Sequence, residues 1–474
     1  MRNALRPGKQ AILSASIAPR GLRAAAWLFL PLSLLGSALS TQVAAQQSNP
    51  APMRLTLDQA IGLALKQNRS IRLRALSVEQ MQSKKDEARS DYLPQISASG
   101  HVLHLTELEG IEIPAAAFGN FPSTGPVPAK SLVIGQGSDT GYTGGVDLGQ
   151  PLTQLFRIHQ ANIAARQDVL VAKTQLDETQ DAIALKVRQL YYNILVNAQK
   201  LEASQDQLAA AQVKDEESRS DVARGNALEE AALQSQASIL QAQQEDLTLR
   251  LEGNDLRRQF ADALGLPVNT AIDLDPGAAA AALDIPSRTD AVKIALDRNQ
   301  DLTAARQTLV KAQAGLAAAK DAYIPDVTAL SLYSYQSGVP FFVHNFGTFG
   351  LSLKYDLFDG GRREASIREA RSELRSAQVT VDNLQSEIEV QVQAVYDRID
   401  ELKQTVALAG QVVLVRTEAA RLADRQFEQT AALNSARSQS HADLASATAS
   451  LLEANCGLSL AEADLKRTIG QMPQ

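Results

Sequence analysis

The sequence is poor in the residues that catalytic and disulfide-bonded proteins need. It has a single cysteine, Cys456, in 474 residues, so no disulfide can form within the chain. A lone thiol among alanines and leucines predicts a small core residue. Its five histidines are scattered, and His101 and His104 lie three apart on an expected strand, where they face opposite sides and cannot share a metal. Because the sequence has no cluster of acid–base or nucleophilic residues, we expect the protein to have no enzymatic activity and to bind no metal or cofactor.

Aromatic residues and long apolar runs are scarce too. Aromatics make up 4% of the chain, which is low for a large globular core and typical of alanine-rich helical bundles. Beyond the N-terminal region no apolar run reaches about eighteen residues, so no membrane-spanning helix is predicted there. The net charge is −7; without the five basic residues of positions 1–45, 41 basic residues face 53 acidic ones. This acidity argues against nucleic acid as a partner.

Residues 1–45 have the pattern of a secretory signal peptide. A basic segment without acidic residues precedes an apolar segment at 24–39, and small residues at 43–45 suit cleavage before Gln46. A membrane anchor is the alternative, but the apolar segment is short and interrupted by Pro31 and Gly36. We therefore expect a cleaved signal peptide.

Glycine and proline are absent from residues 152–224, which are rich in helix-forming residues. Near the middle, apolar residues recur at steps of four and three, the spacing of a helix that packs on another helix. These residues are Ile183, Val187, Leu190, Ile194, Ala198, Leu201 and Leu208. At ~1.5 Å per residue the predicted helix is roughly 100 Å long, more than a compact domain needs.

The same spacing returns 205 positions later, at Ile388, Val392, Val395, Ile399, Val406 and Val413. A second set of matches lies at an offset of 231 positions and relates residues 57–94 to residues 288–325. These matches are Ala60 with Ala291, Ala64 with Ala295, Leu65 with Leu296, Asn68 with Asn299, Tyr92 with Tyr323 and Pro94 with Pro325. Such ordered matches predict an internal duplication.

Each repeat is predicted to contain helices, a strand hairpin, a long helix, a turn and a return helix. The first repeat spans 46–265, with its strand hairpin at about 95–152 and its tip turn near 225. A linker follows at 266–287. The second repeat spans 288–474, with its strand hairpin at about 326–357 and its tip turn near 430. The first hairpin is longer, and its extra residues at about 107–139 are expected to form an exposed loop.

The strand segments alternate between apolar and polar residues. Leu351, Leu353, Tyr355 and Leu357 share one face, with serine, lysine and aspartate on the other. Four strands cannot close a barrel, but several protomers can close one with lipid outside and water inside. Nine of the 21 aromatic residues lie between positions 323 and 358, as in the aromatic girdles of membrane barrels. An ordinary sheet core is the alternative.

Asp359, Gly360 and Gly361 could suggest a phosphate-binding loop. Neither a lysine–serine pair nor a G-x-G-x-x-G pattern accompanies them. We interpret Asp359 as a helix N-cap and the two glycines as a sharp corner between strand and helix.

Three groups of residues resemble the TolC-like outer-membrane efflux protein family, whose members are also called outer membrane factors. They are the opening helix at 57–68, the helix ends Tyr92-Leu93-Pro94 and Tyr323-Ile324-Pro325, and the segment 356–362. The resemblance covers the expected mature chain with its duplication. It implies a mainly α fold with a small β part, in which long antiparallel helical hairpins form an α-barrel and four strands per protomer join a trimeric transmembrane β-barrel.

The same resemblance implies a homotrimer in the bacterial outer membrane, in contact with lipid and with a helical extension in the periplasm. Its partners would be a periplasmic adaptor (membrane fusion) protein and an inner-membrane pump. The protein would conduct substrates passively in a tripartite efflux or type I secretion system. A periplasmic coiled-coil adaptor or scaffold is the alternative, although an adaptor usually has one helical hairpin rather than two long rods.

The family closes its pore at the periplasmic ends of the helices, and the resemblance places the corresponding positions here. Its aromatic and basic closing positions fall on Phe427 and Ala432, and its acidic ring falls on Ala436 and Gln439, so this sequence lacks the basic and acidic residues. Candidate substitutes are a hydrophobic narrowing at Phe427 or the charges of Asp424, Glu428, Glu229 and Glu230, with solvated helix surface as the alternative role of the charged residues. The adaptor-docking tips would be Arg224, Gly225, Asn226, Ala227, Thr430 and Ala431.

Overall fold

The computed structural model describes residues 53–106, 110–135, 138–275, 284–338, 343–429 and 433–471. The predicted signal peptide lies outside these residues. The helices are α1 (Leu57–Gln67), α2 (Arg69–Ser90), α3 (Leu155–Ala223), α4 (Glu229–Leu264), α5 (Arg288–Arg298), α6 (Gln300–Asp321), α7 (Arg362–Glu428) and α8 (Asn434–Thr468). The strands are β1 (Met53–Leu55), β2 (Gln95–His104), β3 (Ile111–Ile113), β4 (Asn120–Phe121), β5 (Gly125–Pro126), β6 (Leu132–Ile134), β7 (Thr140–Pro151), β8 (Ile272–Leu274), β9 (Asp326–Ser337) and β10 (Asn345–Lys354).

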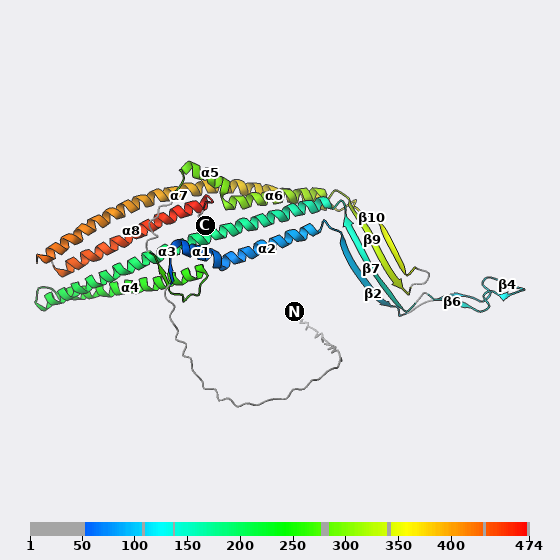
Figure 1. Ribbon diagram of the computed structural model, residues 1–474, viewed down its shortest axis with the longest axis horizontal. Helices are drawn as coiled ribbons and strands as arrows, with labels where there is room; N and C mark the ends of the chain where they lie inside the picture. Colours follow the sequence, from blue (N-terminus) through cyan, green and yellow to red (C-terminus); the bar gives the residue numbers. More distant parts are fainter. Residues whose placement is uncertain are drawn as a thin grey trace, which may run out of the picture. The chain divides into compact units, whose positions relative to one another are not determined.

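Two long helices dominate the fold, as the apolar spacing predicts. Helix α3 has 69 residues and α7 has 67, and each is followed by a return helix of about half that length. Helix α3 packs against α4, α8, α6 and α2, while α7 packs against α8 and α6 (Figure 1). No described helix combines the length and the apolarity that crossing a bilayer requires.

The duplication is visible in a joint that each half builds from one asparagine. Asn68 ends α1 and caps α2 by accepting a hydrogen bond from the backbone N–H of Ser70, and its amide donates to the carbonyl of Ala263 at 2.8 Å. In the second half Asn299 accepts from the N–H of Leu302 and donates to the carbonyl of Thr468 at 2.9 Å. Each asparagine thus satisfies unpaired groups of three helix ends at once.

Glycine completes each joint. Gly265 and Gly470 end the two return helices with φ of +77° and +68°. A Cβ at these positions would lie 2.6 Å from the carbonyl oxygen of Gln67 and 2.4 Å from that of Arg298, respectively. Only glycine allows this close approach together with left-handed backbone.

Each half has its own apolar core beside the joint, anchored by an equivalent tyrosine. The fully buried Tyr191 donates its hydroxyl to the carbonyl of Asp275 at 2.6 Å, and Tyr396 donates to the carbonyl of Pro286 at the same distance. The two tyrosines, on long helices 205 residues apart in sequence, tie those helices to the chain between the halves.

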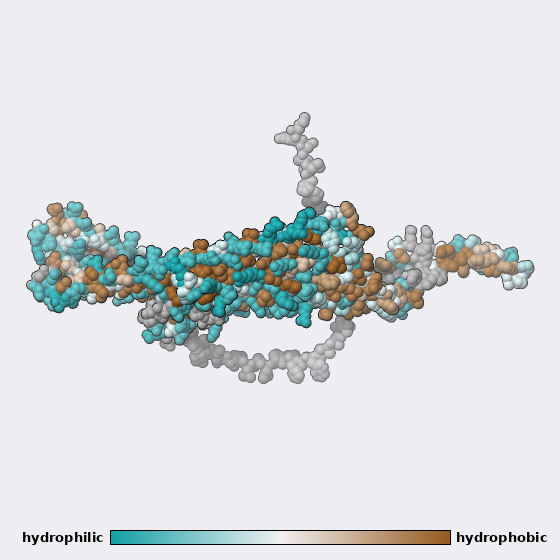
Figure 2. All heavy atoms as spheres, turned by 90° about the horizontal axis from the view of Figure 1, so that it is seen from above, coloured by the Kyte–Doolittle hydropathy of each residue, from teal (hydrophilic) through white to brown (hydrophobic). Residues whose placement is uncertain are grey.

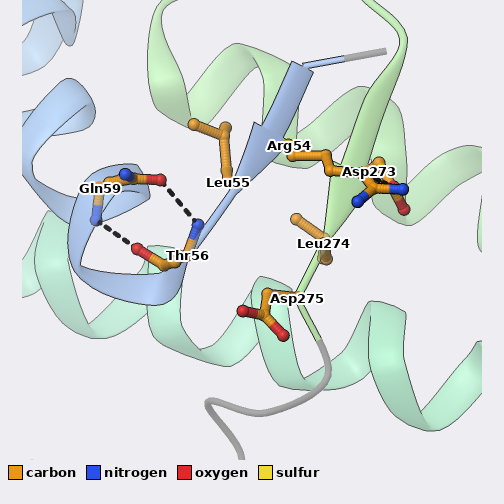
Figure 3. Close-up of a pocket in the computed structure, with 7 residues that line it drawn as sticks. All are labelled: Arg54, Leu55, Thr56, Gln59, Asp273, Leu274 and Asp275. Carbon is orange, nitrogen blue, oxygen red and sulfur yellow. Dashed lines mark hydrogen bonds and ion pairs between the residues drawn. The ribbon is translucent and has the colours of Figure 1, made fainter.

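The chain between the halves is more regular than a linker. Its strand β8 pairs in parallel with β1, and the two strands line a cavity of about 550 Å³ together with the start of α1 (Figure 3). There Thr56 and Gln59 form a reciprocal capping box at the start of α1. The sequence did not predict this strand pair, because three-residue strands carry little local signal.

The remaining long strands form one antiparallel sheet in the order β10-β9-β7-β2. Two expectations need correction. Tyr355 and Leu357 are not in a strand, because β10 ends at Lys354, where its partner β9 begins directly after Pro325. The extra residues of the first hairpin are not a plain loop: their described part contains two short antiparallel pairs, β3 with β6 and β4 with β5.

Register divides the sheet into two faces, since residues paired across strands share a face. One face is mainly apolar and contains Ile96, Val102, Tyr142, Val146, Leu148, Tyr333, Tyr335, Phe349, Leu351 and Leu353. The other is mainly polar and contains Gln95, Ser97, Ser99, His101, Thr143, Asp147, Ser334, Gln336, Thr348, Ser352 and Lys354. Hydrophobic residues gather over the strands in Figure 2, whereas hydrophilic residues predominate along the helices.

Candidate functional site

The first candidate region is the turn between α3 and α4, which includes the predicted docking residues Arg224 to Ala227. Gly225 has φ of +77° and donates its N–H to the carbonyl of Val222, while Asn226 donates to the carbonyl of Asp221 at 2.9 Å. This pair of hydrogen bonds is the Schellman motif, which requires left-handed backbone at the position of Gly225. The turn leaves Leu228 76% exposed at the start of α4.

The second hairpin ends at the same level of the helical bundle. Thr430, Ala431 and Ala432 lie outside the described residues. The N–H of Ser435, at the start of α8, donates to the Glu217 carboxylate of α3 at 3.0 Å, so the two tips lie close together. Leu433, the equivalent of Leu228, is also largely exposed.

Of the predicted gate residues, Phe427 and Asp424 both contact Arg437, and Asp424 also contacts His441. The sequence analysis missed both of these partners. Asp424 accepts hydrogen bonds from His441 at 2.9 Å and from Arg437 at 2.7 Å. These two contacts, His441 first, lower the pKa of Asp424. The guanidinium of Arg437 also lies 5.2 Å from the ring centre of Phe427. Since Arg437 and His441 are one helical turn apart, their spacing on α8 was the available signal.

The other predicted gate residues do not converge. Gln439 donates a hydrogen bond to Gln207 of α3 at 3.2 Å, which ties α8 to α3. It also donates to Asp443 on its own helix at 2.7 Å. Ala436 is exposed one turn before it. Gln439 is therefore a contact between helices in this chain.

The acidic candidates Glu229, Glu230 and Glu428 are exposed and have no ion-pair partner within 4.0 Å in the described part of the chain. Glu229 and Glu230 lie in the first turn of α4, where the helix dipole favours negative charge. They do not join Asp424 in one cluster.

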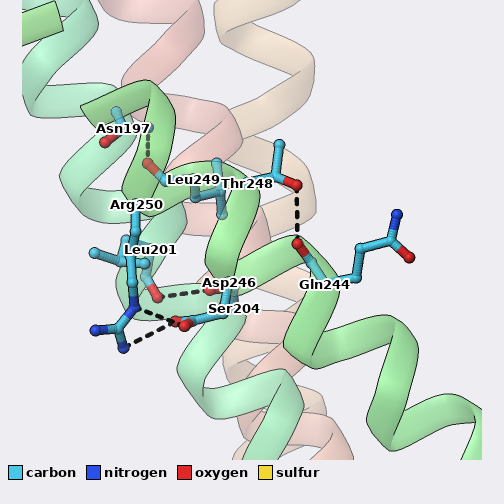
Figure 4. A network of polar contacts seen from close by, with 8 residues as sticks. All are labelled: Asn197, Leu201, Ser204, Gln244, Asp246, Thr248, Leu249 and Arg250. Carbon is cyan, nitrogen blue, oxygen red and sulfur yellow. Dashed lines mark hydrogen bonds and ion pairs between the residues drawn. The ribbon is translucent and has the colours of Figure 1, made fainter. Parts of the chain in front are cut away.

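The first hairpin has a different polar contact near its tip. Asp215 of α3 accepts from the Ser235 hydroxyl of α4 at 2.7 Å and from Arg219 at 2.8 Å, and both Asp215 and Ser235 are buried. Farther along the hairpin, the amide of Asn197 donates to the carbonyl of Leu249 at 3.1 Å, and Arg250 pairs with Asp246 (Figure 4).

The strand-to-helix corner keeps its predicted role with one correction. Gly361, not Asp359, is the N-cap residue of α7. Asp359 acts from two residues upstream and accepts from the N–H groups of Gly361 and Arg363, each at 3.0 Å, and from the Arg363 side chain. These hydrogen bonds, that of the Arg363 side chain first, lower the pKa of Asp359 to about 2. Gly360 and Gly361 have φ of +67° and +85°, which allow the sharp corner.

In the described ranges, no group of three or more histidine, cysteine, aspartate or glutamate residues is arranged to hold a metal ion.

Comparison with solved structures shows the fold. A membrane protein from Pseudomonas aeruginosa is 19% identical with a TM-score of 0.70, over 88% of this chain and 90% of that one. The CmeC outer membrane channel of Campylobacter jejuni is 15% identical with a TM-score of 0.69, over 88% and 85%. The outer membrane protein VceC of Vibrio cholerae is 17% identical with a TM-score of 0.67, over 87% and 96%.

A comparison with curated proteins gives no significant match. The family described as "Outer membrane efflux protein" matches residues 60–266 and 291–471, which cover most of each repeat and most of the chain. Members of this family are transport proteins that form trimers and work with adaptor and pump partners. The chain therefore belongs to the outer membrane efflux protein family: it is a non-enzymatic outer-membrane protein with a periplasmic helical part.

Proposed function

We propose that three copies of this chain close one twelve-stranded β-barrel in the outer membrane and conduct substrates passively through it. The two-faced sheet is the observation that carries this proposal. Its edge strands β2 and β10 have no partner strand among the described residues. Closure between protomers would pair both edges, which a bilayer requires.

The composition of the two faces gives the barrel its orientation. Phe349, Leu351 and Leu353 are 87%, 72% and 69% exposed on the apolar face of the protomer. Such exposure is favourable only against lipid or another protein. The opposite face carries serine, threonine and charged residues, as expected of a water-filled lumen.

The helical hairpins would continue this barrel through the periplasm as a tube. Their tips, at Arg224 to Ala227 and at Thr430 and Ala431, would dock a periplasmic adaptor that is coupled to an inner-membrane pump. The tube would narrow near Phe427, Asp424 and Glu428, with the exposed Glu229 and Glu230 at the same end. Energy would come from the partners, in either an efflux or a type I secretion system.

Cysteine cross-linking tests the closure directly. Within one protomer β2 and β10 are separated by two strands, or about 14 Å at the usual ~4.8 Å spacing, which is too far for a disulfide. We expect cysteines at Val102 on β2 and at one of Phe349, Leu351 or Leu353 on β10 to cross-link protomers into a ladder that ends at the trimer, in a Cys456→Ala background.

The matched control pairs Val102→Cys with Tyr333→Cys, which lies on the same face but on the inner strand β9. This pair should give no cross-link. Planar-bilayer recordings of the purified trimer should show discrete conductance steps. Recovery of the protein in the soluble periplasm, or the absence of any β2–β10 cross-link, would contradict the proposal and favour a periplasmic scaffold.

A further inference from the structure

A basic cavity lies between α2 and α3, close to the strand end of both helices. Its volume is about 430 Å³, and its polar lining consists of Lys85, Arg89, Tyr92, His159, Asn162 and Arg166. Three permanent cations and a histidine therefore surround a space that contains no acidic side chain. The roles discussed above do not use this cavity.

Hydrogen bonds within the protomer shape the cavity. The hydroxyl of Tyr92 lies 3.2 Å from Nδ1 of His159 and so joins α2 to α3. The buried amide of Asn162 donates to the carbonyl of Ala88 at 2.7 Å, and Gln150 donates to the carbonyl of Tyr92 at 3.1 Å. The end of α2 is thus fixed against both α3 and β7, and the cavity exists without a ligand.

The cations of the cavity are poorly compensated. In the described part of the chain, Arg89 and Arg166 have no carboxylate within 4.0 Å, and Lys85 has only its sequence neighbour Asp86, at 3.6 Å. Clustered cations repel one another, so the arrangement favours an anion that could pair with several of them. Arginine in particular matches the oxygens of a phosphate group with two hydrogen bonds.

The duplicated position in the second half keeps two cations, Lys320 and Arg371 in the places of Arg89 and Arg166, but differs in the other residues. There Tyr323 donates its hydroxyl to Glu364, which occupies the place of His159. Leu316 and Ile367 occupy the places of Lys85 and Asn162. An acid thus replaces a base, and an apolar residue replaces a lysine, so the second half does not repeat the set of basic residues that lines this cavity.

The position of the cavity indicates where its ligand comes from. Tyr92 lies three residues before β2, and His159 lies eight residues after the end of β7. Between cavity and strands, Leu93 and Phe156 are 61% and 57% exposed. A charged cavity next to exposed apolar side chains suits a molecule with a phosphate head and an acyl tail better than a free phosphate ion.

We propose that this cavity binds the phosphate headgroup of an anionic phospholipid from the periplasmic leaflet of the outer membrane. The inference rests on the outer-membrane location and not on conduction. Each lysine or arginine near an anionic lipid contributes roughly fivefold to affinity. The variant Arg89→Gln/Arg166→Gln should therefore bind such a lipid roughly thirtyfold more weakly.

The test uses the full-length, delipidated protein and measures retained lipid by native mass spectrometry during titration with dioleoyl-phosphatidylglycerol. Lys320→Gln/Arg371→Gln is the matched control, because it removes the cations at the equivalent positions of the second half. We expect the control to bind like the unaltered protein. A second variant, His159→Glu, introduces the carboxylate of the second half and should also weaken retention.

The proposal would be overturned if the unaltered protein retained no lipid, or if both double variants lost it equally. Retention that survives both His159→Glu and Arg89→Gln/Arg166→Gln would also overturn it. Loss of the trimer in those variants would overturn it too, because the cavity would then be a subunit contact. Titration with inorganic phosphate separates the two sources of a phosphate group. Binding of phosphate without binding of the lipid would overturn the lipid assignment. Conductance recorded in parallel would separate these outcomes from failure of the proposed channel function.

Discussion

The two halves of this protein share their joints and differ in their polar clusters. Asn68 and Asn299, Gly265 and Gly470, and Tyr191 and Tyr396 make equivalent backbone contacts although little of the surrounding sequence is repeated. By contrast, a Tyr–His contact in one half is a Tyr–Glu contact in the other, and the clusters near the tips differ as well. Joints depend on backbone geometry that few residues can satisfy, whereas surface and tip chemistry can diverge freely.

The largest effect in this comparison is expected at the joint glycines. Gly265→Ala and Gly470→Ala should each destabilise the protein by about 3 kcal/mol or more, because a Cβ would meet a carbonyl carbon and oxygen in addition to the strain of a positive φ. Thermal unfolding of the helical circular-dichroism signal measures the loss. Gly225→Ala is the control: its φ is +77° but nothing lies within 4 Å of the added Cβ, so about 1 kcal/mol is expected. Equal shifts in all three variants would contradict the role of close approach.

The anchoring tyrosines provide a smaller test. Tyr191→Phe and Tyr396→Phe should each cost about 1–2 kcal/mol, because a carbonyl oxygen loses its hydroxyl donor. We expect the larger loss at Tyr191, which is fully buried and also contacts the carbonyl of Leu55 at 3.3 Å. Chemical denaturation, followed by the helical circular-dichroism signal, measures the free energy of unfolding of both variants. A larger loss at Tyr396 would reverse this ranking of the two halves.

The tip cluster of the second hairpin should respond to pH. The pKa of Asp424 is lowered from 3.8 by hydrogen bonds from His441 and Arg437, so its ionised form stabilises the folded tip. This contribution is complete above pH 3.8 and is lost as the pH falls below it through the folded-state pKa. In this pH range, the protection of residues 420–441 against amide exchange should fall relative to that of the first tip at the same pH. In Asp424→Asn the tip should exchange faster already at neutral pH, with a weaker acid response; an unchanged acid response would exclude Asp424 as its source.

The smallest effect is expected from the exposed acids at the first tip. The family resemblance places Ala436 and Gln439 at the positions of the acidic ring, and from this placement we predict weak cation selectivity. Glu229→Gln/Glu230→Gln should reduce it only slightly, as exposed charges are screened by salt. Reversal potentials in a salt gradient measure this, with Glu428→Gln as the control in the second half. Strong cation selectivity that disappears in the double variant would show that the acidic charge has moved to the first half.

Much of the architecture could be predicted because its determinants are local. A stretch without glycine or proline and with apolar residues at steps of three and four specifies a long helix. Alternation of apolar and polar residues indicated the two faces of β10, although it continued three residues past the end of the strand at Lys354. Both patterns repeat along the chain, so the duplication and the two rods followed from the sequence. Short strands such as β1 and β8 could not be predicted, since their pairing depends on segments about 220 residues apart.

The candidate sites divide in the same way. The sequence by itself determined where the tips and the Asp359 corner fall, because glycine positions and helix ends are local properties. Only the tertiary structure decided which polar groups meet: Asp424 with Arg437 and His441, and Tyr92 with His159 beside Arg89 and Arg166. Electrostatic interactions depend on distance in space rather than along the chain, so packing of α2 on α3 and of α7 on α8 was needed to reveal them.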